Sequence, residues 1–182
     1  MLRGTAITLA LISGTTYQAT FDADGSVTIF SGKIELETGI GTVSSITSYR
    51  KIRNESHFDI DGTASDLLHL DYHSGNETFQ QELRLASNTT DPLSWQLGAF
   101  YLHVRAFNDQ FQNGLALRGN TTHIDSIGKT DSISVFGEAT YALTPTTHLT
   151  GGIRYTSDNR KLPVGSTDTI SVATGAVVAH RT

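Results

Sequence analysis

The chain has 182 residues, a formal net charge of −5 and 17% charged residues, against about 25% in an ordinary soluble domain. This acidic balance, without a cluster of Lys and Arg, argues against a nucleic-acid partner. The chain has no cysteine, which excludes disulfides, zinc–thiolate sites and thiol catalysis.

The composition favours strands over helices. No apolar run approaches the ~20 residues that a membrane-spanning helix needs. The mean hydropathy is nonetheless close to neutral, at −0.18, as in a membrane β-barrel whose apolar residues alternate with polar ones. Aromatic and β-branched residues are spread along the chain, which is typical of β-structure.

The N-terminal segment has two interpretations. Residues 4–12 are apolar and of strand length, and they follow a single cation, Arg3. A short signal peptide would have a similar apolar stretch, but no Ala-x-Ala cleavage site follows here. We therefore expect a strand over residues 4–12.

Residues 28–37 alternate between two kinds of side chain. Phe30 and Ile34 have one parity, and Lys33 and Glu35 have the other. Successive side chains of a strand point to opposite faces, so the alternation predicts a strand with one apolar and one polar face. A turn at 38–41 then leads into a second strand over residues 42–54.

The clearest hairpin joins residues 78–87 to residues 93–107 through a turn at 88–92. If Arg84 lies opposite Gln96, then Leu83 faces Leu97 and Leu85 faces Trp95. The apolar faces of the two strands coincide in this register, which favours their pairing.

A second hairpin joins residues 131–143 to residues 148–159 through a turn at 144–147. Its facing apolar sides are Val135, Gly137, Ala139 and Tyr141 on one strand and Leu149, Gly151, Ile153 and Tyr155 on the other. Thr140, His148 and the charged residues Glu138 and Arg154 have the other parity. Glu138 and Arg154 are expected as a diagonal cross-strand pair with a structural role.

Short and long connections alternate along the chain. Short turns are expected at 13–14, 38–41, 88–92 and 144–147, and longer polar loops at 55–77, at 108–130 and from Lys161 onward. This alternation is typical of membrane β-barrels, with short periplasmic turns and long outer loops. We expect an all-β fold of about nine strands, an antiparallel meander of long hairpins that forms one partial transmembrane β-barrel segment over residues 1–182. The sheet should be open and curved, with unpaired edges.

Two patterns raise the question of a metal. Asp22 and Asp24, and likewise Asp59 and Asp61, precede a glycine as in a calcium loop, but no downstream bidentate Glu completes either copy. An Asp-Gly turn is the favoured interpretation. His69, Asp71 and His73 would share a face of a strand, yet no fourth ligand is visible, so we expect no metal site.

Three aromatic residues are placed like those of a membrane girdle. Trp95 and Tyr141 lie beside short turns, and Tyr155 lies on the strand that follows. Such residues sit at the headgroup level of a bilayer, while the alternative is a buried position in the core of a soluble sandwich.

Five segments resemble the barrel domain of TonB-dependent outer-membrane receptors and occur in that family's order. They are residues 41–50, 79–87, 95–101, 134–141 and 149–155. The resemblance covers residues 58–159 well and weakens toward both ends. It implies an internal segment of the outer-membrane β-barrel of a Gram-negative bacterium, a barrel of about 22 strands with a plugged lumen.

Members of that family take up scarce nutrients such as siderophore-iron, cobalamin or carbohydrate. The resemblance implies contacts with outer-membrane lipid, with the remaining barrel strands and with the plug domain of the parent protein. TonB would act only through the plug. No plug domain, TonB box or terminal aromatic strand is recognisable, so we expect the coupling machinery to lie outside these 182 residues. No enzymatic activity, cofactor or specific ligand residue is indicated.

A soluble, secreted binding module is the alternative function. An adhesin or lectin-like sandwich would use the same alternation to fill a core between two sheets. Four Asn-x-Ser/Thr sites fit a secreted glycoprotein, namely Asn54, Asn76, Asn88 and Asn120. Refolding in plain buffer would favour the sandwich, whereas a need for detergent would favour the barrel.

Overall fold

The computed structural model describes residues 5–13, 17–19, 23–59, 67–88, 92–162 and 165–182. They form a single antiparallel sheet of ten strands. In chain order these are β1 (Thr5–Ser13), β2 (Tyr17–Ala19), β3 (Ala23–Glu37), β4 (Thr42–Asp59), β5 (His69–Ala86), β6 (Leu93–Asn113), β7 (Asn120–Thr144), β8 (Thr147–Lys161), β9 (Ser166–Ser171) and β10 (Val177–Arg181). One 3-10 helix, η1 (Leu115–Leu117), lies between β6 and β7.

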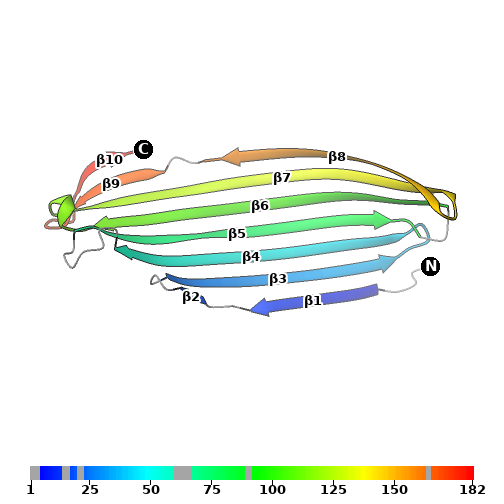
Figure 1. Ribbon diagram of the computed structural model, residues 1–182, viewed down its shortest axis with the longest axis horizontal. Helices are drawn as coiled ribbons and strands as arrows, with labels where there is room; N and C mark the ends of the chain where they lie inside the picture. Colours follow the sequence, from blue (N-terminus) through cyan, green and yellow to red (C-terminus); the bar gives the residue numbers. More distant parts are fainter. Residues whose placement is uncertain (1–4, 14–16, 20–22, 60–66, 89–91, 163–164) are drawn as a thin grey trace.

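The strands are connected as a meander. The main order is β1-β3-β4-β5-β6-β7-β9-β10, while β2 also pairs with β3 and β8 with β7 (Figure 1). β8 pairs with residues 129–144 of β7 and β9 with residues 120–125, so the two pieces lie along the same edge of β7. β1 and β2 share an edge of β3 in the same way. Ten strands therefore occupy eight positions in the sheet, where the sequence predicted about nine strands.

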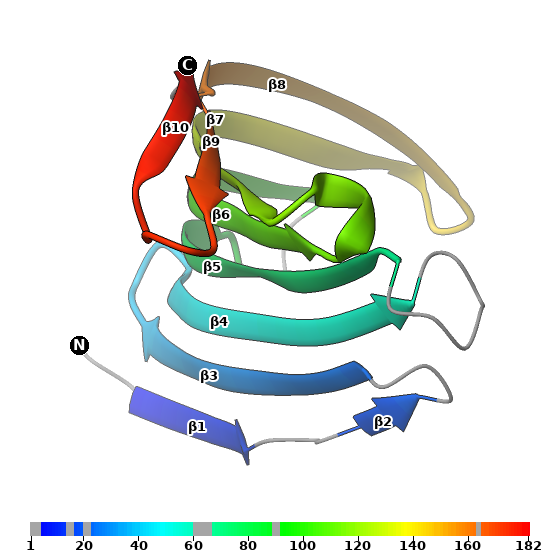
Figure 2. The same cartoon turned by 90° about the vertical axis from the view of Figure 1, so that its left-hand side faces the viewer.

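The sheet is one curved layer that does not close. β1 and β10 remain at opposite edges of the strand order, and Figure 2 shows the layer curving between them. This confirms the predicted all-β meander and partial barrel. Among the described residues no helix is long and apolar enough to cross a membrane.

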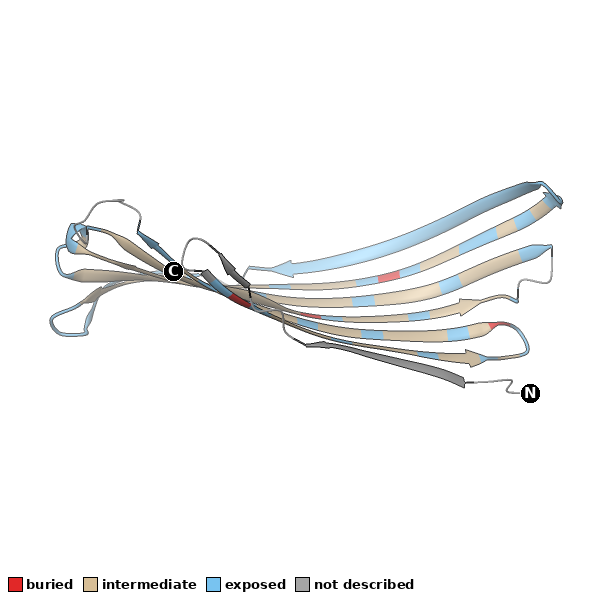
Figure 3. Ribbon diagram, turned by 60° about the horizontal axis from the view of Figure 1, so that its bottom comes forward, coloured by how far each residue is buried: buried red, intermediate tan, exposed pale blue. Residues whose placement is uncertain are grey.

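The described residues contain no buried hydrophobic side chain. Of the polar residues described, only Thr78 and Ser134 are buried. Almost all of the ribbon is half-buried or exposed (Figure 3). A two-sheet sandwich would bury a row of apolar residues between its layers. The sandwich alternative is therefore wrong for the described residues.

The register of β5 against β6 differs from the prediction by two residues. Leu85 lies opposite Leu97, Leu83 opposite Ala99 and Arg84 opposite Gly98. A shift of two residues keeps every side chain on its face, so the alternation pattern does not distinguish the two registers. The turn decides between them, because the Ser87 amide donates to the Trp95 carbonyl at 2.8 Å and the Trp95 amide donates to Ser87 Oγ at 2.8 Å. For β7 and β8 the predicted facing sides are confirmed, with Val135 opposite Tyr155 and Tyr141 opposite Leu149.

The long polar loops were predicted wrongly. β4 continues to Asp59 and β5 begins at His69, so only residues 60–68 connect them. β6 continues to Asn113 and β7 begins at Asn120, and the loop expected from Lys161 onward contains β9 and β10. Backbone ladders do not require apolar side chains, and these extensions carry polar cross-strand pairs such as Asp109 with His123.

Candidate functional site: the two faces of the sheet

Cross-strand pairing divides the side chains into two faces. Face A consists of the even-numbered residues of β3 and β9 and the odd-numbered residues of β4 to β8, because paired residues point to the same side. Face B consists of the residues of opposite parity, which are the odd-numbered residues of β3 and β9 and the even-numbered residues of β4 to β8. The turns β3–β4, β5–β6 and β7–β8 lie together at one end of the sheet, the short-turn end (Figure 1).

Near the short-turn end, face A is a continuous apolar surface, the apolar band. Its exposed large side chains are Phe30, Ile34, Val43, Phe79, Leu83, Leu93, Leu97, Tyr101, Ile133, Val135, Tyr141, Leu149, Ile153 and Tyr155. Ile153 is 81% exposed and Tyr155 69%, so no other part of the described chain covers them. A patch of this extent marks a surface that contacts another protein or a membrane.

The length of the apolar band along the strands matches the thickness of a bilayer. On β6 it runs from Leu93 to Tyr101 and on β7 from Ile133 to Tyr141. Each is nine residues along a strand, against the ~9–11 residues that cross a membrane at a tilt. The strands themselves have 18 residues in β5 and 25 in β7, so they extend well beyond the band.

The few polar side chains within the band bond to one another. Thr47 Oγ1 donates to Gln81 Oε1 at 2.5 Å, and Gln81 Nε2 donates to Ser45 Oγ at 3.0 Å. These cross-strand bonds satisfy polar groups that have no water to bind in an apolar solvent.

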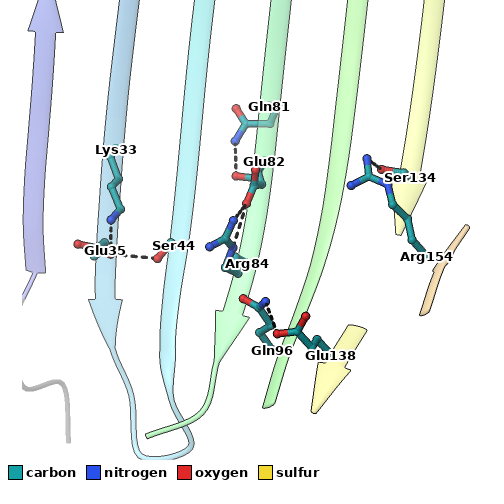
Figure 4. Close-up of polar contacts among 10 residues, drawn as sticks. All are labelled: Lys33, Glu35, Ser44, Gln81, Glu82, Arg84, Gln96, Ser134, Glu138 and Arg154. Carbon is teal, nitrogen blue, oxygen red and sulfur yellow. Dashed lines mark hydrogen bonds and ion pairs between the residues drawn. The ribbon is translucent and has the colours of Figure 1, made fainter. Parts of the chain in front are cut away.

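Face B is charged and polar behind the same band (Figure 4). Lys33 Nζ lies 2.7 Å from Glu35 Oε1, which also accepts a hydrogen bond from Ser44 Oγ at 3.2 Å. On β5, Arg84 Nε donates to Glu82 Oε1 at 2.9 Å. β3 and β5, which flank β4, thus present ion pairs on the side opposite the apolar side chains, and Lys33, Glu35, Glu82 and Arg84 lie on the polar face as predicted. Such a face suits a water-filled lumen.

The predicted diagonal pair of Glu138 and Arg154 is wrong. Glu138 instead accepts from Gln96 Nε2 at 3.3 Å, and Arg154 Nη2 donates to Ser134 Oγ at 2.8 Å (Figure 4). The two residues are diagonal neighbours in the observed register but have other partners: Arg154 lies opposite Phe136, and its guanidinium lies 5.7 Å from the centre of that ring. Both residues do lie on face B, as predicted.

The residues considered for a metal are placed as follows. His69, Asp71 and His73 share face A of β5, but Asp71 is bound by His57 Nδ1 at 2.6 Å from β4. In the described part of the chain no group of three or more His, Asp or Glu is arranged to hold a metal. Asp24 lies in β3 and Asp59 ends β4, while Asp22 and Asp61 lie outside the described residues.

The predicted girdle aromatics Trp95, Tyr141 and Tyr155 all lie on face A. Tyr141 pairs with Leu93 at the short-turn end and is 47% exposed. None of the three lies in a core, which excludes the buried interpretation.

Cross-strand pairs of His and Asp on face A were missed by sequence reasoning. His103 Nδ1 lies 2.7 Å from Asp131 Oδ1, and His123 Nε2 lies 2.5 Å from Asp109 Oδ1. The His123 ring also stacks on Phe111, with ring centres 4.2 Å apart. His57 with Asp71 and His180 with Asp168 complete the set. Only the register, which the sequence did not supply for these segments, would have revealed the pairs.

A shallow apolar depression lies between β6, β7 and β8 within the apolar band. It has a volume of about 530 Å³, and small residues, Gly137, Ala139 and Gly151, form its floor between Trp95 and Ile153. Glu138 is the one charged residue among those that line the depression. The depression therefore offers an apolar contact surface and no set of catalytic groups.

The comparisons with known proteins bear on the whole sheet. A family model described as "TonB dependent receptor-like, beta-barrel" matches residues 4–177. No curated protein and no solved structure matches the chain. The match extends beyond residues 58–159, which the resemblance in the sequence covers well, and it includes β1 to β9.

Proposed function

Because this chain belongs to the β-barrel family of TonB-dependent receptors, we propose that it forms part of the wall of an outer-membrane receptor that takes up a scarce nutrient with energy relayed from TonB. The nutrient class is siderophore-iron, cobalamin or carbohydrate. The role proposed for these residues is structural and transport-related, with no catalytic step.

The separation of the two faces is the observation that carries this proposal. The apolar band on face A has the length and exposure of a lipid-facing surface, and face B carries ion pairs at the same level. Lipid on one side and a wet lumen on the other is the arrangement of a large transmembrane barrel. The open edges at β1 and, at the level of the band, at β8 are where further strands of the parent barrel would pair.

The proposal includes an orientation. Bacterial outer-membrane barrels have short turns in the periplasm and longer connections outside. The turns at 38–41, 87–92 and 145–146 would then lie in the periplasm, and the far ends of β4 to β7 would extend beyond the membrane surface. The plug domain and TonB would be reached from the periplasmic side of face B.

Uptake by bacterial cells tests the function. The full-length protein is produced in cells that lack their own receptors, and labelled ferric siderophore, cobalamin and oligosaccharide are supplied in turn. We expect accumulation of one class, lost when TonB is deleted. Accumulation that persists without TonB, or no accumulation of any class by protein present in the outer membrane, would contradict the proposal.

A further inference from the structure

Far beyond the apolar band, face A carries two rows of acidic and histidine side chains. In the row nearer the band, register places Asp24, Glu55, His73, Asp109 and Asp125 side by side on β3 to β7. The next row outward contains His57, Asp71, Phe111, His123, Asp168 and His180 on β4 to β7, β9 and β10. The two together are called here the His–carboxylate rows.

These rows contain no permanent positive charge. Across the described strands, no lysine or arginine lies in the His–carboxylate rows or farther out on face A, and Arg53 lies one row nearer the band. The rows hold six carboxylates and four imidazoles, so their charge is −6 when the imidazoles are neutral and −2 when all four are protonated. Histidine alone decides how far the negative charge is compensated here.

The carboxylates of the inner row repel one another across the strands. Asp24 lies directly opposite Glu55, and Asp109 lies directly opposite Asp125. Side chains in such positions are about 5 Å apart, and like charges there destabilise strand pairing. The Ser166 hydroxyl donates to Asp125 and lowers the pKa of that carboxyl, so it stays ionised at neutral pH. The pairing of these strands is therefore sensitive to any positive charge placed between them.

His73 lies between two of these carboxylates. It is opposite Glu55 on β4 and opposite Asp109 on β6. A proton on its ring puts a positive charge between Asp24–Glu55 on one side and Asp109–Asp125 on the other. The other titratable or charged groups around it on face A are Arg53, His57 and Asp71.

His123 takes the same part in the outer row. Its Nε2 lies 2.5 Å from Asp109 Oδ1 on β6, and the residue lies directly opposite Asp168 on β9. The ring is stacked on Phe111, with centres 4.2 Å apart and planes 3° apart, so its orientation is fixed. A protonated imidazole donates from both nitrogens, whereas a neutral one donates from one. The other titratable groups around it are Asp125 on its own strand and His180, which bonds Asp168.

We propose that the outer part of the sheet is a pH-sensitive element, in which protonation of His73 and His123 holds β4 to β7 and β9 together. Histidine ordinarily changes its charge between pH 5 and pH 8, and carboxylates remain ionised across most of that range. In mild acid each imidazolium attracts the carboxylates on both sides of it, and at pH 8 only their repulsion remains. Stability of the outer strands is therefore present in mild acid and lost as the pH rises.

Limited proteolysis of the full-length protein in detergent micelles tests this inference. Cleavage rates within residues 69–77 and 108–125 are measured by mass spectrometry at pH 6 and pH 8. Each rate is divided by that of an unstructured peptide of the same sequence at the same pH. Cleavage follows the population of the open segment, so we expect it to be about tenfold slower at pH 6, since a half-exposed ion pair contributes a factor of up to about five.

Two double variants with opposite expectations separate charge from packing. His73→Gln with His123→Gln cannot gain a proton, so it should be cleaved nearly as fast at pH 6 as at pH 8. His73→Arg with His123→Arg keeps the positive charge, so it should resist cleavage at pH 8 as the wild type does at pH 6. Loss of packing alone would make both variants more sensitive than the wild type at both pH values.

His148→Gln is the matched control, because His148 lies on face B beside the β7–β8 turn. It should keep the full difference between pH 6 and pH 8. The inference is overturned by a wild-type rate that is equal at the two pH values, by a response that survives in the glutamine double variant, or by an arginine double variant as sensitive at pH 8 as the wild type. None of these measurements requires transport, so the result is independent of the proposed function.

Discussion

At the scale of single residues, Gly41 shows how tightly the β3–β4 turn packs against the backbone of the neighbouring strand. Its carbonyl accepts hydrogen bonds from the Thr38 amide at 2.9 Å and from Thr38 Oγ1 at 2.6 Å. Its φ of +155° is one that side chains rarely adopt, and a Cβ there would overlap the backbone carbonyl of Ala86. Backbone cannot move aside as the end of a flexible side chain can. The turn therefore requires glycine at this position.

The substitution Gly41→Ala should destabilise the folded protein by about 1–3 kcal/mol, the range for strain of this kind. The measurement is the midpoint of urea-induced unfolding in detergent micelles. Gly39→Ala is the control in the same turn, because a Cβ at Gly39 meets no atom within 4 Å. Equal midpoints for the two variants would show that the turn is not packed against Ala86 as described.

At the scale of the elements, each strand has two environments along its length. In the apolar band its two faces differ, and beyond the band polar side chains occur on both faces. Leu83 on β5 is 52% exposed on face A, while Gln80 on the same strand is half-buried on face B. The cost of a charge should therefore depend on which face receives it.

We expect Leu83→Arg to lower the free energy of unfolding in lipid vesicles by about 2–4 kcal/mol, the cost of an Arg on the lipid face near the midplane. Gln80→Arg adds the same side chain toward the lumen and should cost less than about 1 kcal/mol. Denaturant titration of the two variants in the same vesicles makes the comparison. Similar losses for both would mean that face A does not contact lipid.

The extensions of β4 to β7 beyond the band give a second expectation for the elements. Residues 69–77 of β5 pair with β4 on one side and with β6 on the other. Residues 120–125 of β7 pair with β9, and residues 122–125 pair with β6 as well. Amides in such ladders exchange slowly because they open only with the sheet. Hydrogen–deuterium exchange should therefore be as slow in peptides 69–77 and 120–125 as in 79–86. If these two peptides exchanged as fast as in the urea-unfolded protein, they would be loops, as the sequence predicted, and not strands.

Alternation was enough to predict the strands only where the two faces differ. In residues 28–37, 78–87 and 131–159 an apolar face opposes a polar face, and both strand and facing were predicted correctly. In residues 55–77 and 108–130 polar side chains occur on both faces, so the pattern disappears although the backbone remains paired. Backbone hydrogen bonds between strands do not require a particular pattern of side chains, so the sequence did not predict these strand extensions.

The contacts of the candidate site were harder to predict than its faces. Which face each of Glu138, Arg154, Glu82 and Arg84 occupies followed from parity alone. The partners of Glu138 and Arg154 depend on rotamers and on Phe136, which separates the two along β7 and β8. The pairs His57–Asp71 and His123–Asp109 join strands whose register was not predicted at all.

At the scale of the whole molecule, the sheet has no hydrophobic core among its described residues and must find its apolar environment elsewhere. A soluble domain obtains most of its stability from apolar burial within itself. Here the apolar side chains of face A remain exposed, and in the proposed function membrane lipid would cover all of them at once. The charges of face B lie on the side of the sheet opposite that apolar surface.

Site-directed spin labelling in lipid vesicles tests this central claim most directly. The chain has no cysteine, so single substitutions introduce one label each at Leu97→Cys, Val135→Cys and Ile153→Cys on face A, and at Gln96→Cys, Glu138→Cys and Thr150→Cys on face B. We expect the face A labels to be relaxed by oxygen, which concentrates in lipid, and the face B labels by a water-soluble nickel complex. Labels that are equally wet on both faces, or shielded from both reagents as in a packed core, would contradict the account.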